Sequence, residues 1–188
     1  EIECVERSDA SVLLKVGAGC VWDDFVEYCV KSGFSGVECL SGIPGCMGAA
    51  PIQNIGAYGQ EVAQVIESVI CVSRTDGTSR KYSSEACGFG YRTSHFKKGD
   101  LRTEIVTHVT VRLSLGPPAS PLYPELIRAC GKDCADLKTL RETVIELRRK
   151  KSMIYDSKDP NHRSAGSFFV NPIVPVEVLN TVRLALKE

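Results

Sequence analysis

The sequence predicts an α+β protein with two domains, a strand-rich domain followed by an α+β domain that is only partly present. Apolar and polar residues alternate over short runs in the first half, and helical spacing of apolar residues takes over in the second. Between the halves stands GPPASP at residues 116–121, whose three prolines can continue neither a helix nor a strand ladder. We therefore expect one domain over residues 1–116 and another over residues 117–188.

Short alternating segments of the first half are expected to be strands. They lie at residues 2–6, 12–16, 65–73, 81–83 and 104–113. The segment RTDGTSR, between the third and the fourth of them, carries an Asp-Gly pair typical of a hairpin turn. We therefore expect the chain to turn there and return as a short strand.

A helix is expected among these strands, from about Val21 to Ser32. Asp23 and Asp24 fall in its first turn, where the helix dipole favours acidic residues, and Gly33 ends it. Its apolar face repeats at helical spacing through Trp22, Phe25, Val26, Cys29 and Val30. In the second half, helices are expected near residues 124–129, over 137–151 and after 175.

Composition and charge exclude several classes of function. Apolar residues make up 43% and charged residues 24% of the chain, which suits a globular protein that buries a core. Acidic and basic residues balance at 23 each, so nothing favours nucleic acid or an anionic membrane as a partner. No apolar run is long enough to span a bilayer and no signal-peptide pattern opens the chain. We expect a cytosolic protein without membrane insertion.

The nine cysteines form neither a disulfide framework nor a CxxC pair. The closest spacing is Cys130-x-x-x-Cys134, and no second Cys or His pair accompanies it, so we expect buried reduced thiols and no metal site. The chain begins at Glu1 in a strand-like segment and ends in a helix-like one. We therefore expect an internal fragment of a longer protein.

The stretch SGIPGCMGAAPIQNIGAYGQE, residues 41–61, carries five glycines and two prolines and little side-chain bulk. Glycines let backbone N–H groups face outward and form anion-binding concavities, although turns, bulges and tight packing would explain them equally well. Neither a GxGxxG fingerprint nor a P-loop is present. The side-chain amides of Gln53 and Asn54 favour hydrogen bonding to a flat heterocycle.

Two further motifs are ambiguous when they are considered alone. GFGYRTSHFKKGD, residues 88–100, fits an exposed basic loop, and RSAGSFFVNP, residues 163–172, places Ser167 in an ordinary loop. No histidine has a sequence context that would make it a base for this serine, and the GxSxG elbow of a hydrolase is missing.

Together, SGIPGCMGAAPIQNIGAYGQE, FGYRTSHFK and SAGSFFVNP closely resemble the UDP-N-acetylenolpyruvoylglucosamine reductase family, also called UDP-N-acetylmuramate dehydrogenases. The resemblance covers essentially the whole chain. It implies an FAD-binding domain of the vanillyl-alcohol-oxidase type before the proline-rich break and part of a substrate-binding domain after it. The implied reaction uses NADPH and FAD to reduce UDP-N-acetylglucosamine enolpyruvate in peptidoglycan precursor synthesis, on which bacterial cell shape and division depend.

The resemblance also implies roles for individual residues. Arg92 falls on the catalytic arginine that stabilises enolate-like charge, and Ser167 falls on the catalytic serine that donates a proton. Positions that contact the substrate match Tyr91, Tyr123, Lys151 and Asn171. Positions near the flavin match Ile43, Pro44, Gly45, Gly48, Ala49, Ile52, Gln53, Gly56 and Arg148.

Three features depart from the family pattern. Val170 stands where lysine is frequent, and the family segments that bind FAD phosphates and carry a catalytic glutamate lie outside this chain. We therefore expect the isolated fragment to be inactive. Two alternatives are an FAD-dependent oxidase or dehydrogenase with another substrate, and an inactive nucleotide-binding module. The module is disfavoured because Arg92 and Ser167 are both present.

Overall fold

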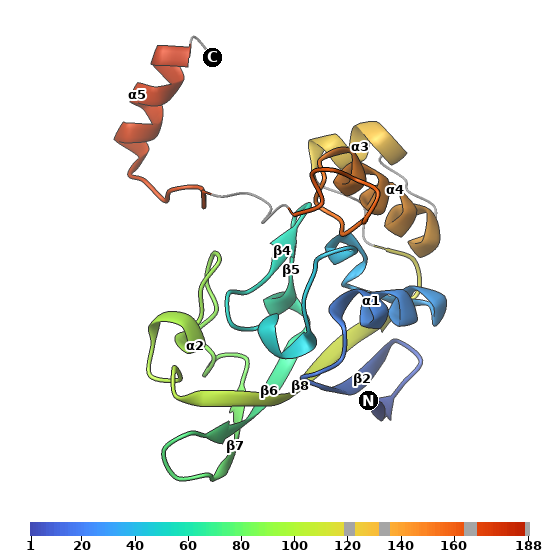
Figure 1. The fold of residues 1–188 in the computed structure, drawn as a ribbon, viewed down its shortest axis with the longest axis vertical. Helices are drawn as coiled ribbons and strands as arrows, with labels where there is room; N and C mark the ends of the chain where they lie inside the picture. The colour runs from blue at the N-terminus through green and yellow to red at the C-terminus, as the bar shows by residue number, and fades with distance from the viewer. Residues whose placement is uncertain (119–122, 132–135, 164–168, 187–188) are drawn as a thin grey trace.

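The computed structural model describes residues 1–118, 123–131, 136–163 and 169–186, and its largest element is an antiparallel sheet (Figure 1). The strand order is β1-β2-β8-β6-β7, and β3 pairs with β8 beside this path. The strands are β1 (Ile2–Arg7), β2 (Ser11–Gly17), β3 (Phe34–Ser35), β6 (Ile66–Ser73), β7 (Ser79–Ser83) and β8 (Glu104–Leu115). The strands expected from alternation are confirmed, and so is the hairpin, which joins β6 to β7.

A single large core joins this sheet to α1 (Trp22–Lys31), the helix expected among the strands. Every second residue of β2 from Val12 to Val16 is buried, opposite buried valines and a leucine of β8. The helix contributes four buried side chains, those of Trp22, Phe25, Val26 and Cys29. Each large apolar side chain buried in this way contributes about 1.5–3 kcal/mol of transfer free energy. The sheet and α1 therefore share one packed core.

The glycine-rich stretch crosses this core without a long regular element. It contains η2 (Met47–Ala49), β4 (Gly56–Ala57) and β5 (Gln60–Glu61), and it is flanked by η1 (Glu38–Leu40) and η3 (Val62–Gln64). The Met47 and Gly48 N–H groups donate to the carbonyls of Cys20 and Ala18, at 2.8 and 2.9 Å. A Cβ on Gly48 would lie 2.7 Å from the Ala18 Cβ. At this glycine the close approach is therefore between two segments of the chain.

The three helices expected in the second half are confirmed, and no strand accompanies them among its described residues. They are α3 (Pro124–Cys130), α4 (Leu137–Lys150) and α5 (Val176–Leu186). The Asp136 side chain caps α4 by accepting a hydrogen bond from the Thr139 N–H. None of the α5 residues is buried, and Figure 1 shows this helix separate from the other elements. The proposed division at residues 116 and 117 stays a prediction.

The second half is joined to the first by α4, which packs on η1 and α1. A small apolar cluster gathers Cys39 of η1 with Leu126, Leu140 and Val144. Beside it, the Arg141 guanidinium donates two hydrogen bonds to the Asp23 carboxylate, at 2.7 and 2.8 Å. Both side chains are mostly shielded from water, so this bidentate pair ties α4 to α1.

Within the described ranges, no helix has the length and apolarity needed to cross a bilayer. No group of three or more potential metal ligands occurs among the same residues. The described cysteines differ in burial: Cys29, Cys39, Cys71 and Cys87 are buried, Cys20 and Cys130 are half-buried, and Cys4 and Cys46 are exposed. The expected burial is therefore confirmed for only part of the set, and the reduced state stays a prediction. Burial raises the pKa of Cys71 to about 12.

Candidate active site

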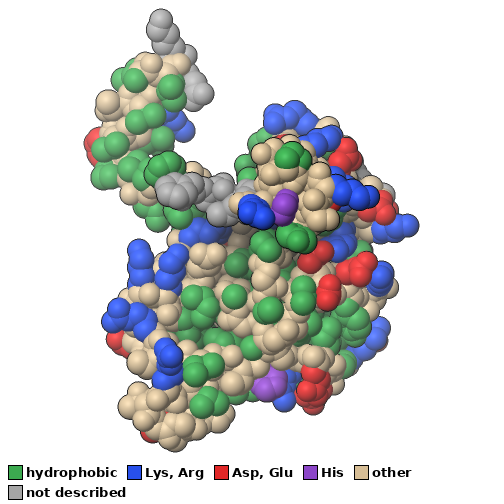
Figure 2. All heavy atoms as spheres, in the orientation of Figure 1, with side chains coloured by type: hydrophobic (Ala, Val, Ile, Leu, Met, Phe, Trp, Pro, Cys, Tyr) green, Lys and Arg blue, Asp and Glu red, His purple; other side chains and the backbone are tan. Residues whose placement is uncertain are grey.

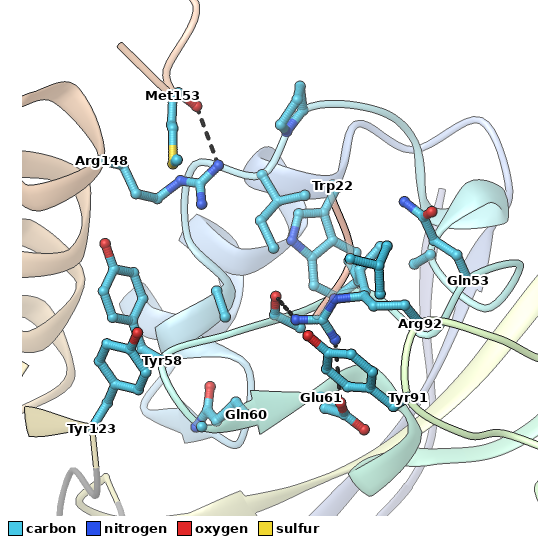
Figure 3. Close-up of a pocket in the computed structure, with 18 of the residues that line it drawn as sticks. Trp22, Gln53, Tyr58, Gln60, Glu61, Tyr91, Arg92, Tyr123, Arg148 and Met153 are labelled. Carbon is cyan, nitrogen blue, oxygen red and sulfur yellow. Dashed lines mark hydrogen bonds and ion pairs between the residues drawn. The ribbon is translucent and has the colours of Figure 1, made fainter. Parts of the chain in front are cut away.

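A cleft of about 830 Å³ opens between the glycine-rich stretch and the helices of the second half. Figure 3 shows Tyr91, Arg92 and Glu61 on one side, Tyr58 and Tyr123 beside α4 on another, and Trp22 between them. Figure 2 shows Lys and Arg side chains around α2 (His95–Lys98) at the edge of this face and apolar side chains nearer its centre. The volume lies in the range typical of small-molecule sites.

Most of the site residues predicted from the sequence meet in this cleft. Those that line it are Ile43, Pro44, Ala49, Gln53, Gly56, Tyr91, Arg92, Tyr123, Arg148, Lys151 and Asn171. They come from segments on both sides of the proline-rich break. Ser167 lies outside the described residues, and its role stays a prediction.

Gly45, Gly48 and Ile52 do not line the cleft; they hold the segments around it. The Gly45 carbonyl accepts a hydrogen bond from the Trp22 N–H at 2.9 Å, at the start of α1. The Ile52 carbonyl accepts one from the Ser94 hydroxyl at 2.6 Å. Gly48 likewise donates to the Ala18 carbonyl, so all three residues hydrogen-bond to other segments of the chain. Their assignment as flavin neighbours stays a prediction.

Arg92 is held at the cleft wall by backbone and side-chain groups of the glycine-rich stretch. Its Nη2 donates to the Gly56 carbonyl at 2.6 Å, and its Nη1 donates to the Asn54 carbonyl at 3.4 Å and to Glu61 Oε1 at 3.2 Å. The backbone of Arg92 has φ +53°, an uncommon value for a residue with a side chain. Its guanidinium also lies over the Tyr91 ring, 5.0 Å from the centroid. The motif GFGYRTSHFKKGD, considered alone, fits an exposed loop, but the Arg92 side chain is only 26% exposed.

The arginine explains the glycine at position 56. A Cβ there would lie 2.6 Å from Arg92 Nη1 and 2.9 Å from the Gln60 carbonyl oxygen. A side chain of any size would therefore displace the guanidinium or open the β4–β5 hairpin. Gly56 lines the cleft as predicted, and the group that crowds it is a catalytic candidate of the same chain.

The opposite wall carries aromatic rings and charges from the ends of α3 and α4, together with Tyr58 from the turn between β4 and β5. Tyr58 and Tyr123 meet edge to face with ring centroids 5.5 Å apart, and the Lys151 ammonium lies 5.8 Å from the Tyr58 centroid. Lys151 also pairs with Glu125 at 2.6 Å, and this hydrogen bond raises the lysine pKa above its ordinary value. The arrangement offers a cation beside two phenols to an anionic ligand.

Arg148 projects from α4 toward the middle of the cleft in Figure 3. Its Nη2 donates to the Met153 carbonyl at 3.1 Å, and burial lowers its pKa. Its Nε is buried without a hydrogen-bond partner in the described part of the chain. An unpaired buried donor of a charged group is costly, so this atom favours a ligand acceptor at the cleft.

Sequence reasoning missed several residues that line the cleft. Tyr58, Gln60 and Glu61 stand in the quoted GAYGQE segment without an assigned role, and Trp22 was placed only in the core. Trp22 is in fact buried and also lines the cleft. Glu125 had no sequence signal, because its relation to Lys151 arises only when α3 packs beside α4.

The chain is similar in sequence and fold to several known proteins. A family model for an FAD binding domain matches residues 3–83. The UDP-N-acetylenolpyruvoylglucosamine reductase of Thermobifida fusca (strain YX) is 44% identical over 181 residues, which cover 94% of this chain and 50% of the relative. The enzyme of that name from Salinispora arenicola (strain CNS-205) is 43% identical over 177 residues, 92% of this chain and 48% of the relative.

The crystal structure of the corresponding reductase (MurB) from Thermus caldophilus superimposes with a TM-score of 0.60. It shares 32% identity, and the match covers 84% of this chain and 48% of that one. In sequence and fold, this chain is similar to the UDP-N-acetylenolpyruvoylglucosamine reductases. It spans about half the length of the curated relatives it matches. The match to the FAD binding domain model and the structural likeness confirm the predicted α+β class with an FAD-binding domain.

Proposed function

We propose that the protein is a flavin-dependent oxidoreductase that uses NADPH and FAD to reduce UDP-N-acetylglucosamine enolpyruvate to UDP-N-acetylmuramate. The reaction would serve peptidoglycan precursor synthesis in the cytoplasm. Residues 1–116 would contribute to the FAD-binding domain and residues 117–188 to the substrate-binding domain. One observation carries the proposal: a single cleft brings Arg92 and the glycine-rich stretch together with Tyr123, Arg148 and Lys151 from the second half.

The cleft suits a flat, largely apolar ring with a polar edge. Trp22, Ile43, Pro44 and Ala49 supply apolar lining, and the Gln53 side chain supplies an amide that can both donate and accept. The unpaired Nε of Arg148 adds a donor that needs an acceptor. These features fit an isoalloxazine ring, which when bound would supply hydride transfer from NADPH to the enolpyruvyl group.

Arg92 would stabilise the negative charge that develops on the substrate. Addition of hydride to the enolpyruvyl group leaves charge on the neighbouring carbon and its carboxylate, and a fixed guanidinium offers donors in the geometry that a carboxylate accepts. Because backbone carbonyls and Glu61 already hold the guanidinium, little reorganisation is needed when the charge appears.

Ser167 would donate the proton that completes the reduction. A hydroxyl can deliver a proton to the carbon next to the carboxylate, and such positioned groups contribute about 10²–10⁴-fold. The assignment rests on the SAGSFFVNP motif. Phe169, Val170 and Asn171 of the same motif line the cleft, and Asn171 would contact the substrate.

Lys151, Tyr91 and Tyr123 would bind the sugar nucleotide. A diphosphate carries the charge that an exposed ammonium recognises, and the tyrosine rings and hydroxyls offer apolar contact and hydrogen bonds. Lys151 and Tyr123 reach the cleft from the C-terminal end of α4 and the N-terminal end of α3. The substrate would thus span both walls of the cleft, since Tyr91 lies beside Arg92 and Tyr123 lies on the opposite side.

The proposal is tested by the absorbance of the purified complete protein. We expect flavin bands that bleach when NADPH is added without oxygen and return when UDP-N-acetylglucosamine enolpyruvate is added. Absence of flavin would contradict the proposal. Flavin that is reduced by NADPH but not reoxidised by the enolpyruvyl substrate would favour the alternative of a related dehydrogenase with another substrate.

A further inference from the structure

A buried polar network lies behind Arg92, and it begins at Asn54. This side chain is 1% exposed, and its backbone has φ +47°. Its Nδ2 donates to Glu61 Oε2 at 2.8 Å and to the Gly90 carbonyl at 3.0 Å, while its Oδ1 accepts from the Ala63 N–H at 3.0 Å. Each polar atom of the amide is engaged, so its orientation is fixed.

Glu61 links this amide to the arginine. One carboxylate oxygen accepts from Asn54 and the other from Arg92 Nη1, at 2.8 and 3.2 Å. The Glu61 backbone is also held in place, because its N–H donates a hydrogen bond to Gln64 Oε1 at 3.0 Å. Glu61 also pairs across the β4–β5 hairpin with Gly56, whose carbonyl accepts from Arg92 Nη2. The hairpin therefore binds the guanidinium at both Nη1 and Nη2.

These hydrogen bonds leave some N–H groups of the Arg92 guanidinium available to a ligand. Nη1 uses both its N–H groups on Asn54 and Glu61, and Nη2 uses one on Gly56. Of the five donors of an arginine, the Nε–H and one Nη2–H have no partner within the described residues. These two are enough for a bidentate contact with a carboxylate.

We propose that Glu61, held by Asn54, is a positioning residue that sets the plane of the Arg92 guanidinium for a substrate carboxylate. The inference rests on the proposed function, because it takes Arg92 to be the group that meets the enolpyruvyl carboxylate. Without the carboxylate of Glu61, a long arginine side chain gains rotamers, and its two available donors lose their common direction.

The test uses Glu61→Gln in the complete protein and follows the two half-reactions separately by anaerobic stopped-flow absorbance. A glutamine cannot offer an acceptor oxygen to both Asn54 and Arg92. Flavin reduction by NADPH should stay within about twofold of the wild type, and reoxidation by the enolpyruvyl substrate should slow about 10–100-fold. The matched control is Glu67→Gln, which removes a carboxylate paired with Arg112 on the sheet and should change neither rate.

A double-mutant cycle with Arg92→Lys separates positioning from a merely structural role. If Glu61 acts through the arginine, Glu61→Gln should cause little further loss of reoxidation rate once Arg92 is lysine. Additive losses would overturn the inference, as would unchanged reoxidation in Glu61→Gln or equal losses in both half-reactions. If Glu61→Gln fails to fold, the cycle is run with Glu61→Asp, which keeps the charge but shortens its reach. If Arg92→Lys alone leaves reoxidation at the wild-type rate, the proposed role of Arg92 fails instead.

Discussion

The two sides of the cleft are built very differently. The glycine-rich side rests on a sheet and on α1, with a large core that includes fully buried residues such as Phe25, Leu14 and Val109. The helical side rests on a cluster of four buried residues and on the Asp23–Arg141 pair. We infer that the first side fixes the geometry of the chemistry, while the second is a more loosely attached wall suited to binding and releasing substrate.

The largest effect is expected on the rigid side, from Gly56→Ala. The new Cβ would fall 2.6 Å from Arg92 Nη1, so the guanidinium must move. We expect substrate-driven reoxidation of the flavin to fall about 100-fold, and stability to fall by about 1–3 kcal/mol from overpacking. Stopped-flow absorbance and urea unfolding measure the two effects.

Gly19→Ala is the matched control for this prediction. A Cβ at Gly19 would meet nothing within 4 Å, so both quantities should stay near wild type. If Gly56→Ala behaves like Gly19→Ala, the guanidinium is not confined as the structure indicates.

On the helical side, Arg141→Ala should loosen α4. It removes two charge-assisted hydrogen bonds to Asp23 and should cost about 1.5–3 kcal/mol. Hydrogen exchange should speed up in α4 while β8 stays protected, because the sheet core does not depend on this pair. Lys138→Ala, which breaks only an exposed pair with Glu142, is the control. Equal acceleration in α4 and β8 would mean that the two sides form one cooperative unit.

The smallest effect is a pH dependence of the same attachment. Burial raises the pKa of the Asp23 carboxyl, but hydrogen bonds from Arg141 and the Gly42 N–H outweigh it, and the pKa lies below the ordinary 3.8. Stability from such a group is fully present above the unfolded pKa and is lost as the pH falls through the folded one. The stability difference between wild type and Arg141→Ala should therefore shrink below about pH 4. Urea unfolding at several pH values measures it, and a constant difference would contradict the assignment.

The regular elements could be predicted from the sequence because their signals are local. The alternation in β2 and β8 and the helical spacing in α1 give the elements to within a few residues. The short pieces β3, β4 and β5 have only two residues each, too few for any period to show. Their positions depend on pairing with distant chain segments.

The candidate site could be predicted only as far as its motifs reach. Arg92, Tyr123 and Lys151 fall on matching family positions and do line the cleft. The link from Glu61 to Arg92 spans 31 residues of sequence and exists only because the β4–β5 hairpin closes against the loop before α2. For the same reason, the crowding of Gly56 by a guanidinium could not be distinguished in sequence from crowding by a cofactor.

The division of labour between the two sides is tested most directly by Arg92→Ala and Lys151→Ala in one anaerobic stopped-flow series. The reoxidation rate of reduced flavin is followed against the concentration of UDP-N-acetylglucosamine enolpyruvate, with Lys150→Ala as control because Lys150 pairs with Glu146 on the exposed face of α4. We expect Arg92→Ala to lower the limiting rate, since it removes charge stabilisation.

Lys151→Ala should instead raise the substrate concentration needed for half the limiting rate by about 10–100-fold, the loss of a contact worth about 1.5–3 kcal/mol. Its limiting rate and its reduction by NADPH should stay near wild type. If both variants change the same parameter, or if neither differs from Lys150→Ala, the two walls do not divide chemistry from binding.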